Sequence, residues 1–230
     1  MECHATNRRP ERRDTERDPC RKRLSRDRGN DRHAPVAAGG VVSENQLSEQ
    51  LGCGRTPIRE ALQRLRFQGF VDIHPRRGAQ VSSVDIVKQL ELLEVRRPLE
   101  ALVADLATRR AHDQERAAMS ALAVDIRGAA ATANPVRYLQ VTRAIHETEV
   151  AAAHNSALAA TIGVIHGQSR RFWFAQTEAS GTFTEGSAIH AEKLEAIAAC
   201  DAAVATGAAH RLLDYLERLT RGALDRDTAR

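Results

Sequence analysis

The sequence is poor in aromatic residues and contains no long apolar stretch. Aromatic residues make up 3% of the 230 residues, so Ala and Leu must supply most of the packing, although a hydrophobic content of 42% is enough to build cores. No apolar run approaches the roughly 18 residues that a membrane-spanning helix needs, and the highly charged N-terminus does not look like a signal peptide. We therefore expect no membrane partner.

Cysteines are also few and scattered. The four lie far apart, in a spacing that fits neither a disulfide framework nor a Cys-x-x-Cys metal site: Cys3, Cys20, Cys53 and Cys200. This usage favours a reducing compartment, so we expect a cytoplasmic protein. The net charge of +4 suits a polyanionic partner without identifying one.

The first 34 residues have almost no apolar side chains beyond Leu24. Such a composition cannot bury enough surface to offset the entropy lost on ordering, so residues 1–34 are predicted to be disordered. Two explanations of this segment stay open. It is either a basic tail that skims DNA or a segment with a wrongly assigned start.

Two short helical patterns follow Ser43. In the first, Leu47 and Leu51 lie one turn apart, and Ser43 with Gln46 forms a capping box. The second runs from about Thr56 to Gln68, and its apolar residues recur at the spacing of one buried helical face: Ile58, Ala61, Leu62 and Leu65. Cys53 and Gly54 separate the two patterns, which indicates a helix-turn-helix.

Two alternating segments come next, Phe70 to His74 and Ala79 to Val84, with Pro75 to Gly78 between them. This arrangement predicts a hairpin with a basic tip. Two helices followed by a hairpin form a winged helix-turn-helix, to which we assign residues 35–84.

The basic residues of this domain point to double-stranded DNA. The second helix of a helix-turn-helix presents its N-terminal side chains to base edges in the major groove, and arginine is the commonest reader of guanine. The hairpin tip would contact the DNA backbone or the minor groove. The candidate DNA-binding residues are Arg55, Thr56 and Arg59 on the helix, with Arg76, Arg77 and Gly78 in the wing.

The stretch SEQLGCGRTPIREALQRLRFQGFVDIHPRRGAQV resembles the DNA-binding domain of GntR-family bacterial transcriptional regulators. Its most specific parts are RTPIREAL and RRGAQV. The resemblance implies that Arg55, Thr56, Arg59 and the wing around Arg77 and Gly78 contact operator DNA. At Gly54 the family usually has Ser or Thr, which caps the recognition helix, so a positioning contact to phosphate is lost here.

From Asp85 onward the pattern has a helical period, and no convincing strand is found. Helices are predicted at about 85–111, 113–130, 135–153, 156–176, 186–199 and 202–225. Asn134-Pro135, Asn155-Ser156 and Ala179-Ser180-Gly181 separate them, and Asp201 is the expected N-cap of the last helix. The chain is therefore predicted to be mainly α, with the winged helix-turn-helix followed by an all-α antiparallel bundle over residues 85–226.

Three segments of this half resemble the FCD ligand-binding domain of the FadR subfamily: EVRRPLEALVADLATRRA, AIHETEVAAAHN and IHAEKLEAIAACDAAVA. Many such domains hold a divalent metal with one Asp and three His. Those positions correspond here to Thr142, His146, His190 and Leu212. Thr is a poor ligand and Leu is none, so His146 and His190 would form an incomplete site for an ion such as Zn²⁺.

A metal-free cavity is therefore the preferred expectation, with His146, His190 and Thr142 facing a small effector. Arg96 corresponds to a family arginine that faces the same cavity, which points to a small carboxylate or another anion. Arg97 is the alternative if the helix is rotated. The other histidines of the bundle, which include His166, are expected to be core or surface residues, and Phe172 and Trp173 to pack between helices.

The leading interpretation is a homodimeric transcriptional regulator, and members of this family are more often repressors. A bound metabolite would change the affinity of the dimer for operator DNA. A second is a ligand-binding or dimer-forming remnant with impaired DNA binding. A third is a metal-dependent hydrolase that combines His146 and His190 with Glu147, Glu149 or Glu185. No ligand run such as His-x-x-x-His and no activated nucleophile supports this third reading, so we expect no enzyme.

Overall fold

The computed structural model describes residues 39–74, 77–83, 85–132, 134–176 and 183–228. It divides into two compact units, with the boundary between Ser82 and Ser83. The expected disorder of residues 1–34 and the predicted turn at 179–181 lie outside the described residues. Among the described helices, none combines the length and the apolar character that crossing a bilayer requires.

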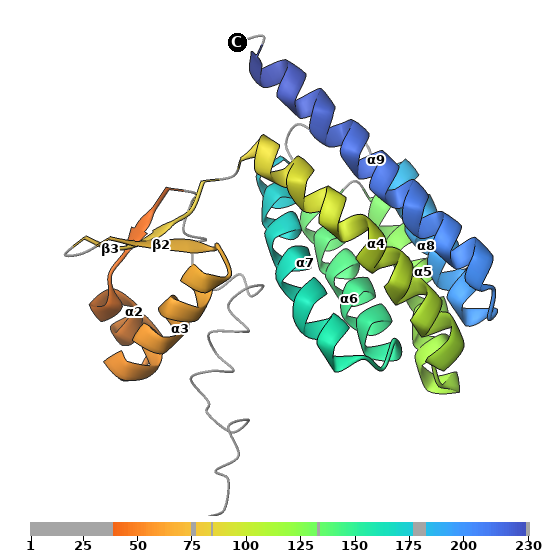
Figure 1. Ribbon diagram of the computed structural model, residues 1–230, viewed down its shortest axis with the longest axis horizontal. Coiled ribbons are helices and arrows are strands. Elements are labelled where there is room, and N and C mark those ends of the chain that lie inside the picture. Colours follow the sequence, from red (N-terminus) through yellow and green to blue (C-terminus); the bar gives the residue numbers. More distant parts are fainter. Residues whose placement is uncertain (1–38, 75–76, 84, 133, 177–182, 229–230) are drawn as a thin grey trace, which may run out of the picture. The chain divides into compact units, whose positions relative to one another are not determined.

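The first unit contains two helices and a small antiparallel sheet (Figure 1). Helix α2 (Glu44–Leu51) is followed by α3 (Arg55–Phe67), and strands β1 (Val41–Val42), β2 (Val71–His74) and β3 (Gly78–Val81) pair in the order β1-β3-β2. The winged helix-turn-helix is therefore confirmed. Strand β1 was not predicted, because two residues are too short to show an alternating pattern.

Local sequence explains why α2 begins where it does. The Ser43 hydroxyl accepts a hydrogen bond from Gln46 N–H at 3.1 Å, and the Gln46 side chain accepts one from Ser43 N–H at 3.0 Å. The predicted capping box is thus confirmed, and it satisfies two backbone donors that the helix cannot use. Beneath the helices lies a small core that includes Ile58, Leu62, Val71 and Ala79.

The second unit is an all-helical bundle over its described residues, as predicted (Figure 1). Helix α4 packs lengthwise on α9, α5 on α8, and α6 lies against α4, α5 and α7. The helices are α4 (Ile86–Arg110), α5 (Asp113–Ala131), α6 (Pro135–Ala152), α7 (Ser156–Gln176), α8 (Thr184–Ala198) and α9 (Ala202–Thr228).

The predicted helix starts are confirmed at several caps. Asn134 Oδ1 accepts from Arg137 N–H at 3.0 Å, and Asp201 Oδ1 accepts from Val204 N–H at 3.0 Å. Pro135 occupies the first turn of α6, where its missing N–H costs nothing. The bundle buries an Ala-rich core, with Ile126, Ile145 and Leu194 among its larger members.

Gly78 supports a sharp prediction about the wing. Its φ is +94°, and a Cβ there would lie 2.6 Å from the carbonyl oxygen of Val42. Gly78→Ala should therefore destabilise the first unit by about 1–3 kcal/mol, since the new methyl meets backbone that cannot move aside. Equilibrium urea unfolding followed by circular dichroism measures this change.

Gly54→Ser is the matched control. Gly54 has φ −63°, and a Cβ there would lie no closer than 3.7 Å to Pro57 Cδ. The added hydroxyl can cap α3, so this variant should be as stable as the parent or more stable by a few tenths of a kcal/mol. If both variants unfold at the same urea concentration, the close approach at Gly78 is not a constraint.

Candidate functional site

The N-terminal end of α3 presents the polar residues expected to read DNA. Arg55, Thr56 and Arg59 are all exposed, while Ile58 is buried in the core of the unit. Gly54 is the N-cap and makes no side-chain cap bond, as the sequence predicted. The free N–H groups of this helix end favour a phosphate.

Arg59 is held by Glu44 of α2. Its Nε donates to Glu44 Oε1 at 3.1 Å and its NH2 group donates to Oε2 at 2.9 Å. The hydrogen bond from Arg59 keeps the pKa of the Glu44 carboxyl below its usual value. Because both side chains are exposed, the pair orients the guanidinium more than it stabilises the fold.

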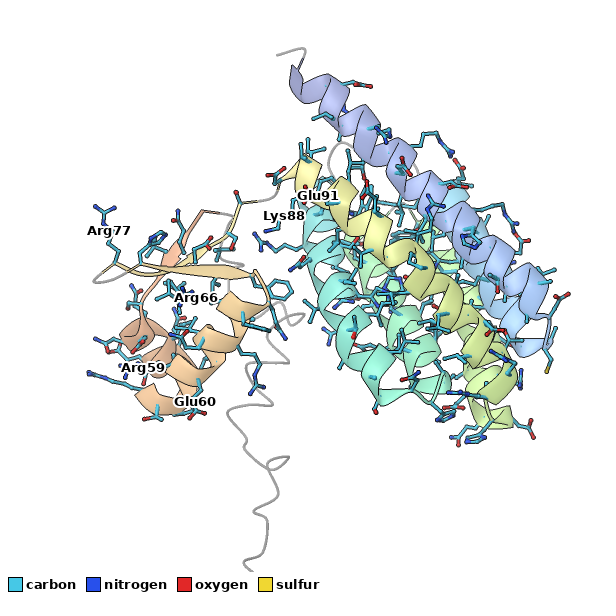
Figure 2. All side chains as sticks on the ribbon, viewed as in Figure 1. Arg59, Glu60, Arg66, Arg77, Lys88 and Glu91 are labelled. Atoms are coloured by element: carbon cyan, nitrogen blue, oxygen red, sulfur yellow. The ribbon has the colours of Figure 1, made fainter. Side chains whose placement is uncertain are left out.

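The wing adds a second basic position. Arg77 is exposed and extends from the hairpin, while Arg59 lies by the first turns of α3 (Figure 2). Arg77 N–H donates to the His74 carbonyl at 3.1 Å, which closes the turn before Gly78. Arg76 lies outside the described residues, so the structure gives it no position.

The bundle encloses a cavity of about 60 Å³. Polar and charged side chains line one part of it, and aromatic and aliphatic side chains line the rest. The polar part consists of Arg96, Thr142, His146, Ser169, Arg170 and His190, and the remainder of Tyr138, Leu139, Trp173, Phe183, Leu212, Tyr215, Leu216 and Leu219.

All four positions carried over from the metal-binding pattern line this one cavity. Thr142 and His146 come from α6, His190 from α8 and Leu212 from α9. The Thr142 hydroxyl donates to the Tyr138 carbonyl at 2.9 Å. Leu212 contributes only an apolar surface.

Arg96, rather than Arg97, faces the cavity. Arg96 is 2% exposed and lines it. Arg97 is partly exposed and bonds to Asp214 at 2.7 Å and Glu217 at 3.2 Å. The alternative rotation of α4 is therefore excluded.

The Arg96 guanidinium is the centre of a buried polar network. Its Nε donates to Glu100 Oε1 at 2.8 Å, its NH1 group donates to Ser169 Oγ at 3.1 Å, and its NH2 group contacts His146 Nε2 at 3.0 Å. Ser169 Oγ also accepts from the Gln89 side chain at 3.2 Å. The NH2 group also pairs with Glu100 Oε1 at 2.7 Å. A guanidinium has five N–H groups, so one hydrogen on NH1 remains for a ligand.

Glu100 is the anion of this network and is 1% exposed. Besides Arg96, it contacts His166 Nε2 at 2.8 Å and Lys193 Nζ at 3.5 Å. Burial alone would raise the pKa of Glu100, but Lys193, Arg96 and His166 together hold it well below its usual value. Glu100 is therefore a carboxylate near neutral pH.

Lys193 and Glu149 form a second buried pair, 2.9 Å apart. Both side chains are 1% exposed. Burial raises the pKa of Glu149 to about 7, although Lys193 opposes the shift. The charge of this pair therefore changes with a proton close to neutral pH, whereas the Arg96–Glu100 pair keeps its charges.

The three buried histidines are neutral. Burial lowers the pKa of His146, His166 and His190, and the charge of Arg96 lowers it further, although Glu100 opposes the shift. Lys193 adds to the lowering of the pKa of His166 and His190. Since a guanidinium can only donate, His146 Nε2 accepts, and its proton lies on Nδ1. That Nδ1 has no hydrogen-bond partner among the described residues.

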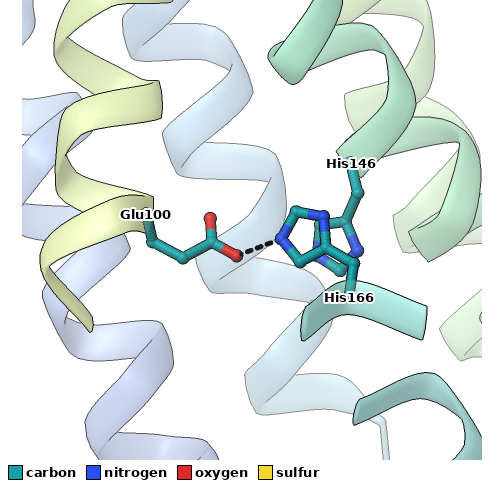
Figure 3. A group of neighbouring side chains, drawn as sticks. All are labelled: Glu100, His146 and His166. Atoms are coloured by element: carbon teal, nitrogen blue, oxygen red, sulfur yellow. Dashed lines mark hydrogen bonds and ion pairs between the residues drawn. The ribbon is translucent and has the colours of Figure 1, made fainter. Parts of the chain in front are cut away.

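One buried group has the chemistry of a metal site. Glu100, His146 and His166 each offer a ligand atom, and these atoms lie within 4.8 Å of one another (Figure 3). Two of these ligand atoms already accept hydrogen bonds, however, because Arg96 donates to both Glu100 and His146. Neither this group nor the set carried over from the family pattern fits a resident metal ion, since the latter lacks ligands at Thr142 and Leu212.

The carboxylates that a hydrolase would need are engaged elsewhere. Glu147 is exposed and bonds to Arg143 at 2.7 Å, and Glu185 pairs with Arg218 on the surface. Glu149 pairs with Lys193. None of the three lines the cavity with His146 and His190.

Sequence reasoning missed much of the buried network. The expectation that His166 is a core or surface residue agrees with its 3% exposure and its bond to Glu100, but its stacking on the His146 ring, with centroids 4.0 Å apart, was not foreseen. Glu149 was named only as a possible partner of the histidines in a hydrolase, and Glu100, Lys193 and Ser169 were not identified. Trp173, which was expected to pack between helices, lines the cavity. One signal was available, since Leu93, Arg96, Glu100, Val103 and Ala107 follow helical spacing and all are buried.

Comparison with protein families gives two matches that together cover most of the chain. Residues 32–81 match the model for bacterial regulatory proteins of the gntR family. Residues 91–215 match the FCD domain. The first match falls within the first unit of the chain and the second match within the second unit.

Curated relatives resemble the chain over short stretches. A Streptomyces ambofaciens protein, an uncharacterized HTH-type transcriptional regulator, is 44% identical over 50 residues, which are 22% of this chain and 21% of that protein. The Nta operon transcriptional regulator of Aminobacter aminovorans is 38% identical over 77 residues, 34% of this chain and 37% of that protein. The matched stretch thus spans only about a fifth to a third of these relatives.

Solved structures resemble nearly the whole chain. Escherichia coli McbR/YncC has a TM-score of 0.73 at 20% identity, over 89% of this chain and 94% of that one. A putative transcriptional regulator GntR from Rhodococcus sp. RHA1 has a TM-score of 0.66 at 19% identity, over 88% and 99%. At such identities these structures show the fold alone. Together with the two family matches, the fold places this chain in the GntR family of bacterial transcriptional regulators, as a member with an FCD domain.

Proposed function

We propose that this regulator binds operator DNA as a homodimer and that a small anionic metabolite in the bundle cavity modulates the binding. The observation that carries the proposal is the cavity, in which a buried guanidinium and two neutral imidazoles face a mostly apolar chamber. Such a chamber with few convergent polar groups is the usual form of a ligand site. Its most suitable occupant is a carboxylate.

The donors of the cavity support an anion. Arg96 retains a hydrogen on NH1, and Ser169 Oγ already accepts from Arg96 and Gln89, so its own O–H is left to donate. His146, His190 and Thr142 line the same cavity. The two histidines are the further candidate donors, because the Thr142 hydroxyl already donates to the Tyr138 carbonyl. A carboxylate accepts such bonds with both oxygens, and charge-assisted bonds of this kind are the stronger ones.

The volume limits the size of the ligand. A cavity of about 60 Å³ is well below the roughly 150 Å³ that takes benzene in an engineered protein core. A carboxylate of two to four carbons, such as acetate, lactate or pyruvate, therefore suits it better than an aromatic acid. The aliphatic wall, which includes Leu212 and Leu216, would cover the carbon chain.

The connection between the units offers a route to the DNA. Helix α4 carries Arg96, and only residues 82–85 separate its first turn from strand β3 of the wing. A ligand that binds more tightly to one arrangement of α4 than to another shifts the arrangement that the DNA-binding units adopt. If the protein is a repressor, the bound anion disfavours the arrangement that binds the operator.

The proposal places the protein in the cytoplasm and assigns it no enzymatic activity. The surface pairing of Glu147 and Glu185 supports the latter, because neither carboxylate is available to act with the buried histidines. The remnant that has lost DNA binding is the competing reading. Gel shift with DNA flanking the protein's own gene separates the two, since the remnant gives no shifted band.

Arg59→Ala tests the recognition helix. Loss of a side chain that reads a base should weaken operator binding about 10- to 100-fold and relax sequence preference. Fluorescence anisotropy at constant salt measures both effects. Arg66→Ala is the matched control, because it removes the same charge from the other end of α3, where Arg66 is also exposed. Equal affinities for the two variants would show that α3 does not read bases through its N-terminal end.

Glu149 should make anion binding dependent on pH. Below pH 7 its carboxyl is protonated, so the groups around it, Lys193, Arg96 and Glu100, retain one positive charge in excess. The affinity for acetate should therefore fall as pH rises through 7, by up to about tenfold per pH unit. Isothermal titration between pH 6 and pH 8 measures it.

Two variants check this assignment. Glu149→Gln mimics the protonated carboxyl and should bind acetate equally across the range. Glu147→Gln, on the same helix but exposed, should keep the pH dependence of the parent. If the parent binds acetate equally at pH 6 and pH 8, Glu149 is not linked to the site.

A further inference from the structure

We propose that the guanidinium of Arg96 replaces a divalent cation and masks a latent metal site formed by Glu100, His146 and His166. The cavity would then hold its anion on an organic cation built into α4, without a metal ion. The statement about the anion rests on the proposed function. The statement about the masked site stands on its own.

The three ligands come from three helices that pack together. Glu100 lies on α4, His146 on α6 and His166 on α7, and their ligand atoms lie within 4.8 Å of one another (Figure 3). All three are buried, at 1%, 4% and 3% exposure. Two imidazoles and one carboxylate form a ligand set that zinc accepts, with further positions open to water.

Arg96 occupies the electron pairs that a metal would need. It donates to Glu100 Oε1 at 2.8 Å and contacts His146 Nε2 at 3.0 Å. The third candidate, His166, is turned toward Glu100 with its Nε2 at 2.8 Å. A dication at this point would also face the charges of Arg96 and Lys193, which water cannot screen in the buried interior.

Two other residues of the cavity offer a metal ion little. Thr142 donates its hydroxyl to the Tyr138 carbonyl, and Leu212 presents only an aliphatic surface. The positive charge nevertheless remains, because Arg96 is 2% exposed and bonded on three sides. The interior thus contains a cation, the Arg96 guanidinium, in contact with Glu100, Ser169 and His146.

Arg96→Ala is the decisive variant, because it should create metal binding. Removal of the guanidinium frees His146 Nε2 and the Glu100 carboxylate beside His166. The variant should bind Zn²⁺ stoichiometrically, as measured by metal analysis after desalting, and Co²⁺ should give visible d–d absorption bands. The parent should bind neither ion at this site, and Arg96→Ala/His166→Ala should lose both signals.

A second group of possible metal ligands on the surface must be removed from every protein that is compared, because it could bind the added metal. His112, Glu115 and His154 also place ligand atoms within 4.8 Å of one another and are wholly or partly exposed. His154→Ala in every background eliminates that group, since the His154 ring contacts Glu115 at 3.1 Å and lies against His112. Any remaining difference between the parent and Arg96→Ala then belongs to the interior.

Loss of Arg96 leaves Glu100 with fewer partners, so the variant should be less stable. Zn²⁺ should raise its melting temperature but not that of the parent, and Arg96→Gln, which keeps a polar side chain, should behave in the same way. If Arg96→Ala folds only when Zn²⁺ is present, recovery of the helical circular dichroism signal on adding Zn²⁺ shows that the variant binds the metal. Folded Arg96→Ala and Arg96→Gln that bind no metal would overturn the proposal, as would parent protein that binds Zn²⁺ tightly through His166.

A titration of the parent with acetate, lactate and pyruvate in the presence of EDTA separates the two proposals. Binding under these conditions supports both. If none of the three binds but Arg96→Ala gains Zn²⁺, the carboxylate effector fails and the masked site holds. If a carboxylate binds the parent only after Zn²⁺ is added, the masked site is overturned and the carboxylate effector holds.

Discussion

A charged network without access to bulk water constrains this bundle. Arg96, Glu100, Lys193 and Glu149 are each at most 2% exposed, yet they lie in the middle of an Ala-rich core. Each buried charge is tolerated only because an opposite charge neutralises it, and removing one partner from such a pair typically costs about 3–5 kcal/mol. The helices that carry these residues, α4, α6 and α8, are therefore held in one register by charge as well as by packing.

The same network gives the cavity its chemistry. Two neutral imidazoles, those of His146 and His190, and the Arg96 guanidinium belong to its polar side, and aromatic and aliphatic residues form the remainder. The Arg96–Glu100 pair has fixed charges, whereas the pKa of Glu149 near 7 lets the Lys193–Glu149 pair change its charge with one proton. The proposed anion binding, the proton uptake of Glu149 and the proposed exclusion of a metal would thus all follow from one arrangement of side chains.

The DNA-binding unit follows simpler and more local rules. A capping box starts α2, a glycine N-cap starts α3, and a glycine with positive φ closes the wing against Val42. Each of these features depends on residues within a few positions of one another or on one tight backbone approach. The Arg59–Glu44 pair is the exception, since it ties α3 to α2 through exposed side chains and so orients a residue proposed to read DNA.

Capping, turn chemistry and apolar periodicity are local properties, so the helix-turn-helix, the hairpin and nearly all helix limits of the bundle can be predicted from the amino-acid sequence. The family resemblance also identified four positions that line one cavity, namely Thr142, His146, His190 and Leu212. The burial of Glu100, by contrast, depends on how the helices pack against one another, as does the exposure of Val95 and Leu102 on the same helix, at 55% and 41%. Sequence periodicity cannot show that Lys193, on another helix, supplies the opposite charge that stabilises a buried Glu100.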